Sequence, residues 1–284
     1  MEGISKIIKN TRVPVFIKAY TYLNDHRFEG RAVLPAVEVM QLLSGSVSRE
    51  IEGINAGNIF NAEFLRFLPI DEGIETIKAF NEITEDENHD LRSVLIVEER
   101  LKGGIKRLKE HAALIFKRAE TDFEQLSFEE ANKIDPETYK VTAEKVYSEL
   151  VPFGASYHNI VDDVQLFKGG ALTRVKAQDI VSIQGPLGSP FPLDAALHAA
   201  CVWGQRYSGF VGFPVSFRSR HIIRPTVAGD TYFCRVNPVS INPGQAQFDI
   251  WIYGEGGVLF EAVFNVNMKD VTSGRMRPPL WISV

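Results

Sequence analysis

A weak internal repeat constrains the fold more than any other feature of the sequence. One proline opens an apolar stretch at residues 35–48, and another opens a second apolar stretch at residues 190–203. Further along each half, Pro69 and Gly73 match Pro225 and Gly229, which gives an offset of about 156 residues. Repeated units of this size bury their apolar faces against their neighbours. We therefore expect two similar units in tandem, packed as a pseudo-dimer with a site between them.

Both apolar stretches are predicted to be buried helices. A proline in the first helical turn loses no hydrogen bond, because its missing N–H would have no partner there. After Pro35, apolar residues recur at helical spacing at Val37, Met40, Leu43 and Val47. Residues 190–203 are apolar nearly throughout. A shorter helix is predicted over residues 142–150, where Thr142 is a suitable N-cap.

Short β-prone segments follow each predicted helix. The turns Lys102-Gly103-Gly104 and Lys168-Gly169-Gly170 are typical of hairpins, because glycine adopts the positive φ of a tight turn. The predicted strands are residues 14–19, 62–68, 74–83, 91–101 and 105–117, then 159–167, 171–177, 231–240, 246–253 and 257–268. One long helix wrapped by an antiparallel sheet is a hot dog unit. The predicted fold class is therefore α+β, a double hot dog.

The boundary between the two units is predicted from composition. Residues 119–140 are acidic, weakly periodic and contain Asp135-Pro136, which is typical of a linker. We expect an N-terminal hot dog over residues 1–135 and a C-terminal one over residues 136–284.

Composition narrows the class of protein. A hydrophobic fraction of 45% supports a sizeable core, and a net charge of −5 argues against a dedicated nucleic-acid binder. No run of 18 apolar residues predicts a membrane span, and the first residues contain no apolar signal core. The two cysteines, Cys201 and Cys234, lack metal-site spacing and are expected to be reduced and buried. These features favour a cytoplasmic protein.

The first candidate catalytic residues precede the first helix. His26, Gly30 and Pro35 have the spacing His-x3-Gly-x4-Pro. An imidazole can remove a proton, and a glycine N–H near a helix N-terminus can bind a developing oxyanion. This pair suits proton removal next to a thioester carbonyl, with His26 as base and Gly30 as donor.

The second candidate group lies on the second helix. Asp194 and His198 are four residues apart and share a helix face, so the imidazole can orient the carboxyl. Apolar neighbours on both sides, including Leu193, should desolvate the Asp194 carboxyl and favour its protonated form. Asp194 is therefore predicted to act as an acid.

These motifs resemble those of the dehydratase domains of polyketide synthases and polyunsaturated fatty acid synthases. His-x3-Gly-x4-Pro is similar to their first catalytic motif, and Asp-x3-His is similar to their second. Their third motif, Tyr-Gly-Pro-x-Phe, is degraded here: Phe153 replaces Tyr, Ala155 replaces Pro, Tyr157 replaces Phe, and Gly154 alone matches. The resemblance spans roughly residues 14–270.

The resemblance implies dehydration of a 3-hydroxyacyl thioester carried on the phosphopantetheine arm of an acyl carrier protein, with no metal and no organic cofactor. It implies that His26 removes the α-proton, that Gly30 polarises the thioester carbonyl, and that Asp194, with His198, protonates the departing hydroxyl. The residues that it implies around the substrate are Leu34, Pro35, Phe153, Gly154, Tyr157 and Leu193. The implied partners are the carrier protein and other synthase domains, and the chain is expected as a monomeric pseudo-dimer or a homodimer.

Other functions use the same residue types. A hot dog isomerase or thioesterase, a cyclase of the product-template kind, and a non-catalytic acyl-binding domain all fit the pattern, and the degraded third motif favours the last. Zinc bound by His26, Asp194 and His198 is disfavoured because no further ligand cluster accompanies them. Gly154-Ala155-Ser156-Tyr157-His158 lacks the last glycine of a serine-hydrolase elbow. The remaining histidines, His89, His111, His158 and His221, are expected to be structural or solvent-facing.

Two basic groups are candidates for docking an acidic carrier. One is the hairpin residues Lys102, Lys106, Arg107 and Lys109, and the other is Arg218, Arg220 and Arg224. For the hairpin, a solvated edge protected by lysine is the preferred interpretation.

Overall fold

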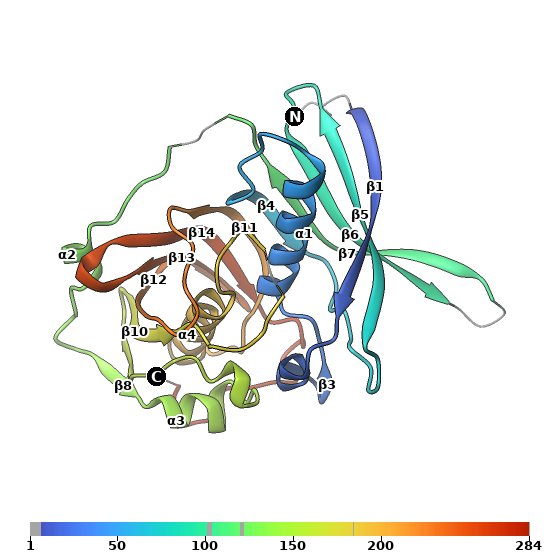
Figure 1. The fold of residues 1–284 in the computed structure, drawn as a ribbon. Coiled ribbons are helices and arrows are strands. Elements are labelled where there is room, and N and C mark those ends of the chain that lie inside the picture. The colour runs from blue at the N-terminus through green and yellow to red at the C-terminus, as the bar shows by residue number, and fades with distance from the viewer. Residues whose placement is uncertain (1–6, 101–103, 120–121, 184, 284) are drawn as a thin grey trace.

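A computed structural model describes residues 7–100, 104–119, 122–183 and 185–283 of the chain. Within these residues, twelve strands form one continuous antiparallel sheet in the order β1-β5-β6-β7-β4-β11-β14-β13-β12-β10-β9-β8 (Figure 1). The strands of the first half are β1 (Ile7–Lys18), β4 (Asn58–Phe64), β5 (Thr76–Asp86), β6 (Leu91–Arg100) and β7 (Lys106–Phe116). Those of the second half are β8 (Tyr139–Val141), β9 (Val164–Phe167), β10 (Gly170–Lys176), β11 (Phe213–Ile222), β12 (Thr231–Asn242), β13 (Gln245–Tyr253) and β14 (Leu259–Lys269).

The sheet order is the same in both halves, read in opposite directions. Toward the centre, the first half runs β1-β5-β6-β7-β4 and the second runs β10-β12-β13-β14-β11, with β9 and β8 added outside β10. The two halves join where β4 pairs with β11, for example Ala62 opposite Phe217. An offset of 156 residues, the distance from Pro69 to Pro225, carries β4 into β11 and β5 into β12. The predicted double hot dog fold is confirmed.

Each half of the sheet holds one long helix. Helix α1 (Ala36–Glu50) packs on β1, β5, β6 and β7, and helix α4 (Phe191–Tyr207) packs on β10, β12 and β13 (Figure 1). The side chains between helices and sheet form one buried cluster that extends through both halves. The two units therefore share a core, and burial in one half depends on the other.

The segment between the halves is more ordered than its composition predicts. Ser127 and Glu130 form a capping box that starts the short helix α2 (Phe128–Ala131). Phe123, Leu126 and Phe128 of this segment pack on Trp251 and its neighbours, away from the main core. The acidic residues of this segment from Asp122 onward face solvent, while these apolar ones cover the sheet. The division at residue 135 stays a prediction.

The other predicted elements match with specific differences. The helix predicted over residues 142–150 is α3 (Ala143–Lys145), capped by Thr142, followed by one π-helical turn (Val146–Leu150). The strand predicted from residue 159 begins at Val164. Lys168 and Gly169 form the predicted turn between β9 and β10, whereas Lys102 and Gly103 of the other turn lie outside the described residues.

Strand β11 is absent from the sequence-based prediction. Its sequence interrupts apolar residues with Arg218, Arg220 and His221, which obscures the strand pattern. Arg220 is 1% exposed and forms a buried ion pair with Glu261, in which Nε and Oε1 are 2.7 Å apart. The second basic group is thus not a continuous surface patch, because Arg220 is internal. This strand joins the two halves, so the prediction missed their connection.

Candidate active site

His26 is held between a short helical turn and a tight hairpin. A 3₁₀ turn (Thr21–Asp25) precedes it, and the two-stranded ribbon β2 (Arg27–Phe28) and β3 (Arg31–Ala32) follows. Glu29 and Gly30 form the two-residue turn, with φ of 48° and 80°. This turn type requires positive φ at both positions, which explains the glycine. Gly30 is exposed, and its role as a carbonyl donor stays a prediction.

The surroundings of His26 fix its protonation state. Its Nδ1 lies 3.1 Å from the carbonyl oxygen of Val33. A carbonyl can only accept, so Nδ1 carries the proton and donates, which leaves Nε2 with a free lone pair. Burial lowers the pKa of the His26 imidazole, with a smaller opposing effect from the nearby Asp194 carboxyl. His26 is therefore a neutral base at neutral pH.

Asp194 lies in the first turn of α4 and is 4% exposed. His198 stands one turn further along the helix, with its Nε2 3.0 Å from Oδ2 of Asp194. The approach is close, but its angle does not meet hydrogen-bond geometry within the described residues. Misaligned hydrogen bonds that tighten with substrate are common in unliganded active sites. The predicted Asp194–His198 contact is present, and both side chains are buried.

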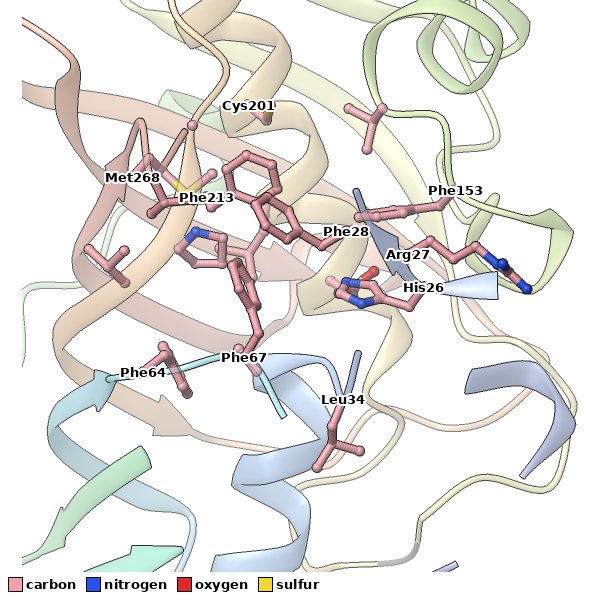
Figure 2. Close-up of a pocket in the computed structure, with 18 of the residues that line it drawn as sticks. His26, Arg27, Phe28, Leu34, Phe64, Phe67, Phe153, Cys201, Phe213 and Met268 are labelled. Atoms are coloured by element: carbon pink, nitrogen blue, oxygen red, sulfur yellow. The ribbon is translucent and has the colours of Figure 1, made fainter. Parts of the chain in front are cut away.

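One pocket brings these groups together. It has a volume of about 300 Å³, and its wall includes His26, Asp194, His198 and Leu34. Phe28, Phe67 and Phe213 form an aromatic cluster in it, with centroids 4.3 Å apart for Phe28 and Phe67 and 5.1 Å apart for Phe28 and Phe213. Figure 2 shows these three rings between His26 and the pair Cys201 and Met268. Most of the pocket wall is apolar, and its acidic, basic and histidine side chains are His26, Arg27, Glu29, Arg66, His111, Asp194 and His198.

The degraded third motif supports His26 from behind. Phe153 stacks on the His26 ring, with centroids 4.4 Å apart and planes at 30° (Figure 2). Asp25 accepts hydrogen bonds from the N–H and hydroxyl of Ser156, and a Cβ on Gly154 would lie 2.4 Å from the Asp25 carboxyl. Any side chain at position 154 would therefore clash with Asp25, which explains the glycine. Phe153 positions the imidazole by ring stacking, which needs no hydroxyl.

The predicted substrate residues divide into two groups. Leu34 and Phe153 line the pocket. Among the residues that the structure describes, Pro35, Gly154, Tyr157 and Leu193 are not part of the pocket wall, and they support it from outside. Pro35 has extended backbone and is the N-cap of α1, which begins at Ala36, one residue later than predicted.

Several polar side chains near the pocket were not predicted from the sequence. His111 lines the wall, is 5% exposed, and has an Nδ1 without a partner in the described structure, so it is not solvent-facing, and its structural role stays a prediction. Glu38 in α1 is fully buried and accepts a 2.6 Å hydrogen bond from Tyr22. Burial raises the pKa of Glu38 to about 8. Tyr22 lies 16 residues before Glu38, so no local motif marks this pair.

The remaining predictions can be located in the fold. Within the described residues, no group of three or more acidic, cysteine or histidine side chains could hold a metal ion, and no helix is long and apolar enough to cross a membrane. Cys201 and Cys234 are free and buried. On the basic hairpin, Lys106 pairs with Glu98 and Lys109 with Glu99. This pairing neutralises part of the charge proposed for docking, in keeping with a solvated edge.

Comparison with solved structures finds this fold in dehydratase domains. The CurJ dehydratase, an inactive mutant bound to a compound, has a TM-score of 0.73 and 17% identity over 93% of this chain and 95% of that chain. A dehydratase domain of a mycocerosic acid synthase-like polyketide synthase has a TM-score of 0.72 and 13% identity over 93% of each chain. The domain from the CurK module of curacin polyketide synthase has a TM-score of 0.70 and 16% identity over 94% of each chain.

The likeness is structural. No known protein family and no curated protein matches the sequence. The fold is that of the dehydratase domains of polyketide synthases, a double hot dog over nearly the whole chain. The arrangement of His26 and Asp194 is the observation from which an activity can be argued.

Proposed function

We propose that this protein is a dehydratase that converts a 3-hydroxyacyl thioester to the 2-enoyl thioester. The observation that carries this proposal is a neutral histidine and a buried carboxyl in one apolar pocket. Two of the similar structures are inactive mutants in which a histidine is replaced by phenylalanine. A base and an acid held in different environments can act on one substrate at one pH.

The proposed reaction divides two proton transfers between the halves of the protein. Nε2 of His26 takes the proton from the carbon next to the thioester carbonyl, and the electron pair of that C–H bond forms the new double bond. The bond from the next carbon to its hydroxyl breaks, and Asp194 gives that hydroxyl a proton, so water leaves. The Val33 carbonyl stabilises the imidazolium through Nδ1–H. Gly30 is proposed to donate its N–H to the thioester carbonyl.

The pocket favours an apolar acyl chain. Beyond the catalytic groups its wall includes Phe28, Phe213, Cys201 and Met268, and its volume of about 300 Å³ is at the small end for ligand sites. A cyclase that folds a long polyketone needs a wide and polar cavity, so the lining supports the dehydratase over that alternative.

The substrate is proposed to arrive on the phosphopantetheine arm of an acyl carrier protein, within polyketide or polyunsaturated fatty acid synthesis in the cytoplasm. The proposed chemistry needs no metal or organic cofactor, because proton transfer to and from side chains accounts for every bond made and broken. Pairing with other synthase domains and the choice between monomer and homodimer belong to the same proposal.

Mass spectrometry of the acyl thioester tests the activity. Wild type, His26→Ala and Asp194→Asn would each be incubated with a 3-hydroxyacyl thioester on a carrier protein or a pantetheine mimic, after circular dichroism has confirmed folding. We expect loss of one water with wild type and none with either variant. Full turnover by both variants, or no turnover by wild type across several chain lengths, would refute the proposal.

A further inference from the structure

Tyr147 has a buried hydroxyl whose hydrogen-bonding capacity is almost fully used. It lies on the π-helical turn Val146–Leu150 and is 6% exposed. Its oxygen accepts the backbone N–H of Asn159 at 2.9 Å and that of Ile160 at 2.8 Å. A phenol has two acceptor positions and one donor. Both acceptor positions are occupied, so only its own O–H remains available.

Among the residues that the structure describes, the remaining partner for that O–H belongs to the proposed site. Nδ1 of His198 lies 3.5 Å from the Tyr147 oxygen. Because the Tyr147 hydroxyl can only donate, Nδ1 must accept, and the proton of the neutral imidazole is placed on Nε2. That nitrogen is the one 3.0 Å from Oδ2 of Asp194. The tautomer of His198 is thus determined by a residue on another element.

We propose that Tyr147 is a positioning residue that fixes the Nε2–H tautomer of His198 and, through it, the oxygen of Asp194 that carries the catalytic proton. This inference rests on the proposed dehydratase function. When this 3.0 Å contact tightens into a hydrogen bond with substrate bound, Oδ2 accepts from His198 and the acidic proton sits on Oδ1. The Tyr147 contact opposes a second proton on His198, because an Nδ1–H would point at an oxygen with no free lone pair.

Other contacts hold Tyr147 in place. His158 stacks on its ring at 4.3 Å with planes at 12°, and Nε2 of His158 donates to the Phe153 carbonyl at 2.8 Å. Phe153 in turn stacks on His26. The ionisable groups facing His198 are Asp194 on its own helix, Tyr147 from the π-helical turn, and His26 from the opposite half. His158 lies behind Tyr147.

The test compares Tyr147→Phe with Tyr22→Phe. Tyr22 is a matched control, because it too is a buried phenol that accepts a backbone N–H, from Ile183 at 3.2 Å, but it does not contact His198. We expect Tyr147→Phe to lower kcat about 10–100-fold with KM nearly unchanged. We expect Tyr22→Phe, once its folding is confirmed, to keep kcat within about twofold of wild type.

The pH profile separates tautomer control from a merely structural role. Without the Tyr147 hydroxyl, nothing opposes a proton on Nδ1 of His198, and an imidazolium beside Asp194 favours its carboxylate and removes the acid. The acid limb of kcat should therefore move upward in Tyr147→Phe. In a His198→Gln background, where the amide can both donate and accept but does not titrate, Tyr147→Phe should leave the acid limb unmoved.

A direct readout does not depend on activity. In protein labelled with ¹⁵N at histidine, the imidazole shifts report which nitrogen of His198 carries the proton. We expect protonated Nε2 in wild type and a mixture of tautomers in Tyr147→Phe. Unchanged shifts in that variant, or an acid limb that moves equally in the His198→Gln background, would overturn the inference. An inactive wild type with the expected shifts would refute only the proposed function.

Discussion

Glu38 and Asp194 occupy equivalent positions in the two halves of the molecule. Each lies in the first turn of its central helix, and the 156-residue offset taken from Pro69 to Pro225 relates them. Both are buried, at 0% and 4% exposure. Asp194 nevertheless lines the pocket, whereas Glu38 is closed off behind Tyr22. Equivalent backbone positions therefore carry a proposed catalyst in one half and a sequestered acid in the other.

The difference arises from what surrounds each carboxyl. Asp194 has His198 one turn away, while the equivalent position in α1 is Leu42. One oxygen of Glu38 accepts a hydrogen bond from the Tyr22 hydroxyl, and its other oxygen has no partner in the described structure. A duplicated fold thus supplies two candidate acids, and the side chains around them decide which one meets substrate.

The largest expected effect is the loss of activity when the Asp194 carboxyl is replaced. Asp194→Asn removes the proposed proton donor, so kcat should fall by about 10²–10⁴-fold. The matched change Glu38→Gln keeps the size of the side chain and leaves it uncharged. Because this side chain lies outside the pocket, activity should stay within about twofold of wild type. Turnover rates on the same thioester measure both. Equal losses in the two variants would break the distinction between the two carboxyls.

The next effect concerns stability against pH. The folded-state pKa of Glu38, about 8, lies above its ordinary value of 4.5, so the native state binds the extra proton between these pH values. Its contribution is full below about pH 4.5 and is lost as pH rises toward 8, at about 1.4 kcal/mol per pH unit. Urea unfolding from pH 5 to 8 should show this decline in wild type. A decline of the same slope in Glu38→Gln would assign it to another group.

A smaller effect tests the contact that joins the loop of the second half to the His26 segment. In Gly154→Ala the new Cβ would meet the Asp25 carboxyl and Cβ at 2.4 and 2.6 Å. Overpacking of this kind costs about 1–3 kcal/mol, and the displaced Asp25 should lower activity as well. Thermal unfolding and turnover rates give the two readouts. Gly169→Ala, at a position without positive φ where a Cβ would meet the Phe167 ring at an ordinary 3.5 Å, is the control for the loss of a glycine.

The smallest effect concerns the phenol that closes off Glu38. Tyr22→Phe leaves Glu38 without its 2.6 Å hydrogen bond, which should cost about 1–3 kcal/mol of unfolding free energy. Because that bond lowers the pKa of Glu38 against the effect of burial, its loss should raise the pKa further. The decline in stability, which begins near pH 4.5, would then extend to a higher pH than in wild type. No change in the pH dependence would show that Tyr22 does not control this carboxyl.

The sequence by itself determined the repeat, the two proline-started helices, most strands and the spacing of His26 and Asp194. These features are local: helical periodicity, turn glycines and short motifs need only neighbouring residues. Strand β11 was not predicted from the sequence, because Glu261, whose ion pair allows Arg220 to be buried, lies 41 residues away. The tertiary structure alone decided which buried acid faces the pocket and which nitrogens of His26 and His198 carry protons. Those outcomes depend on Val33, Tyr22 and Tyr147, whose contacts exist only after the chain has folded.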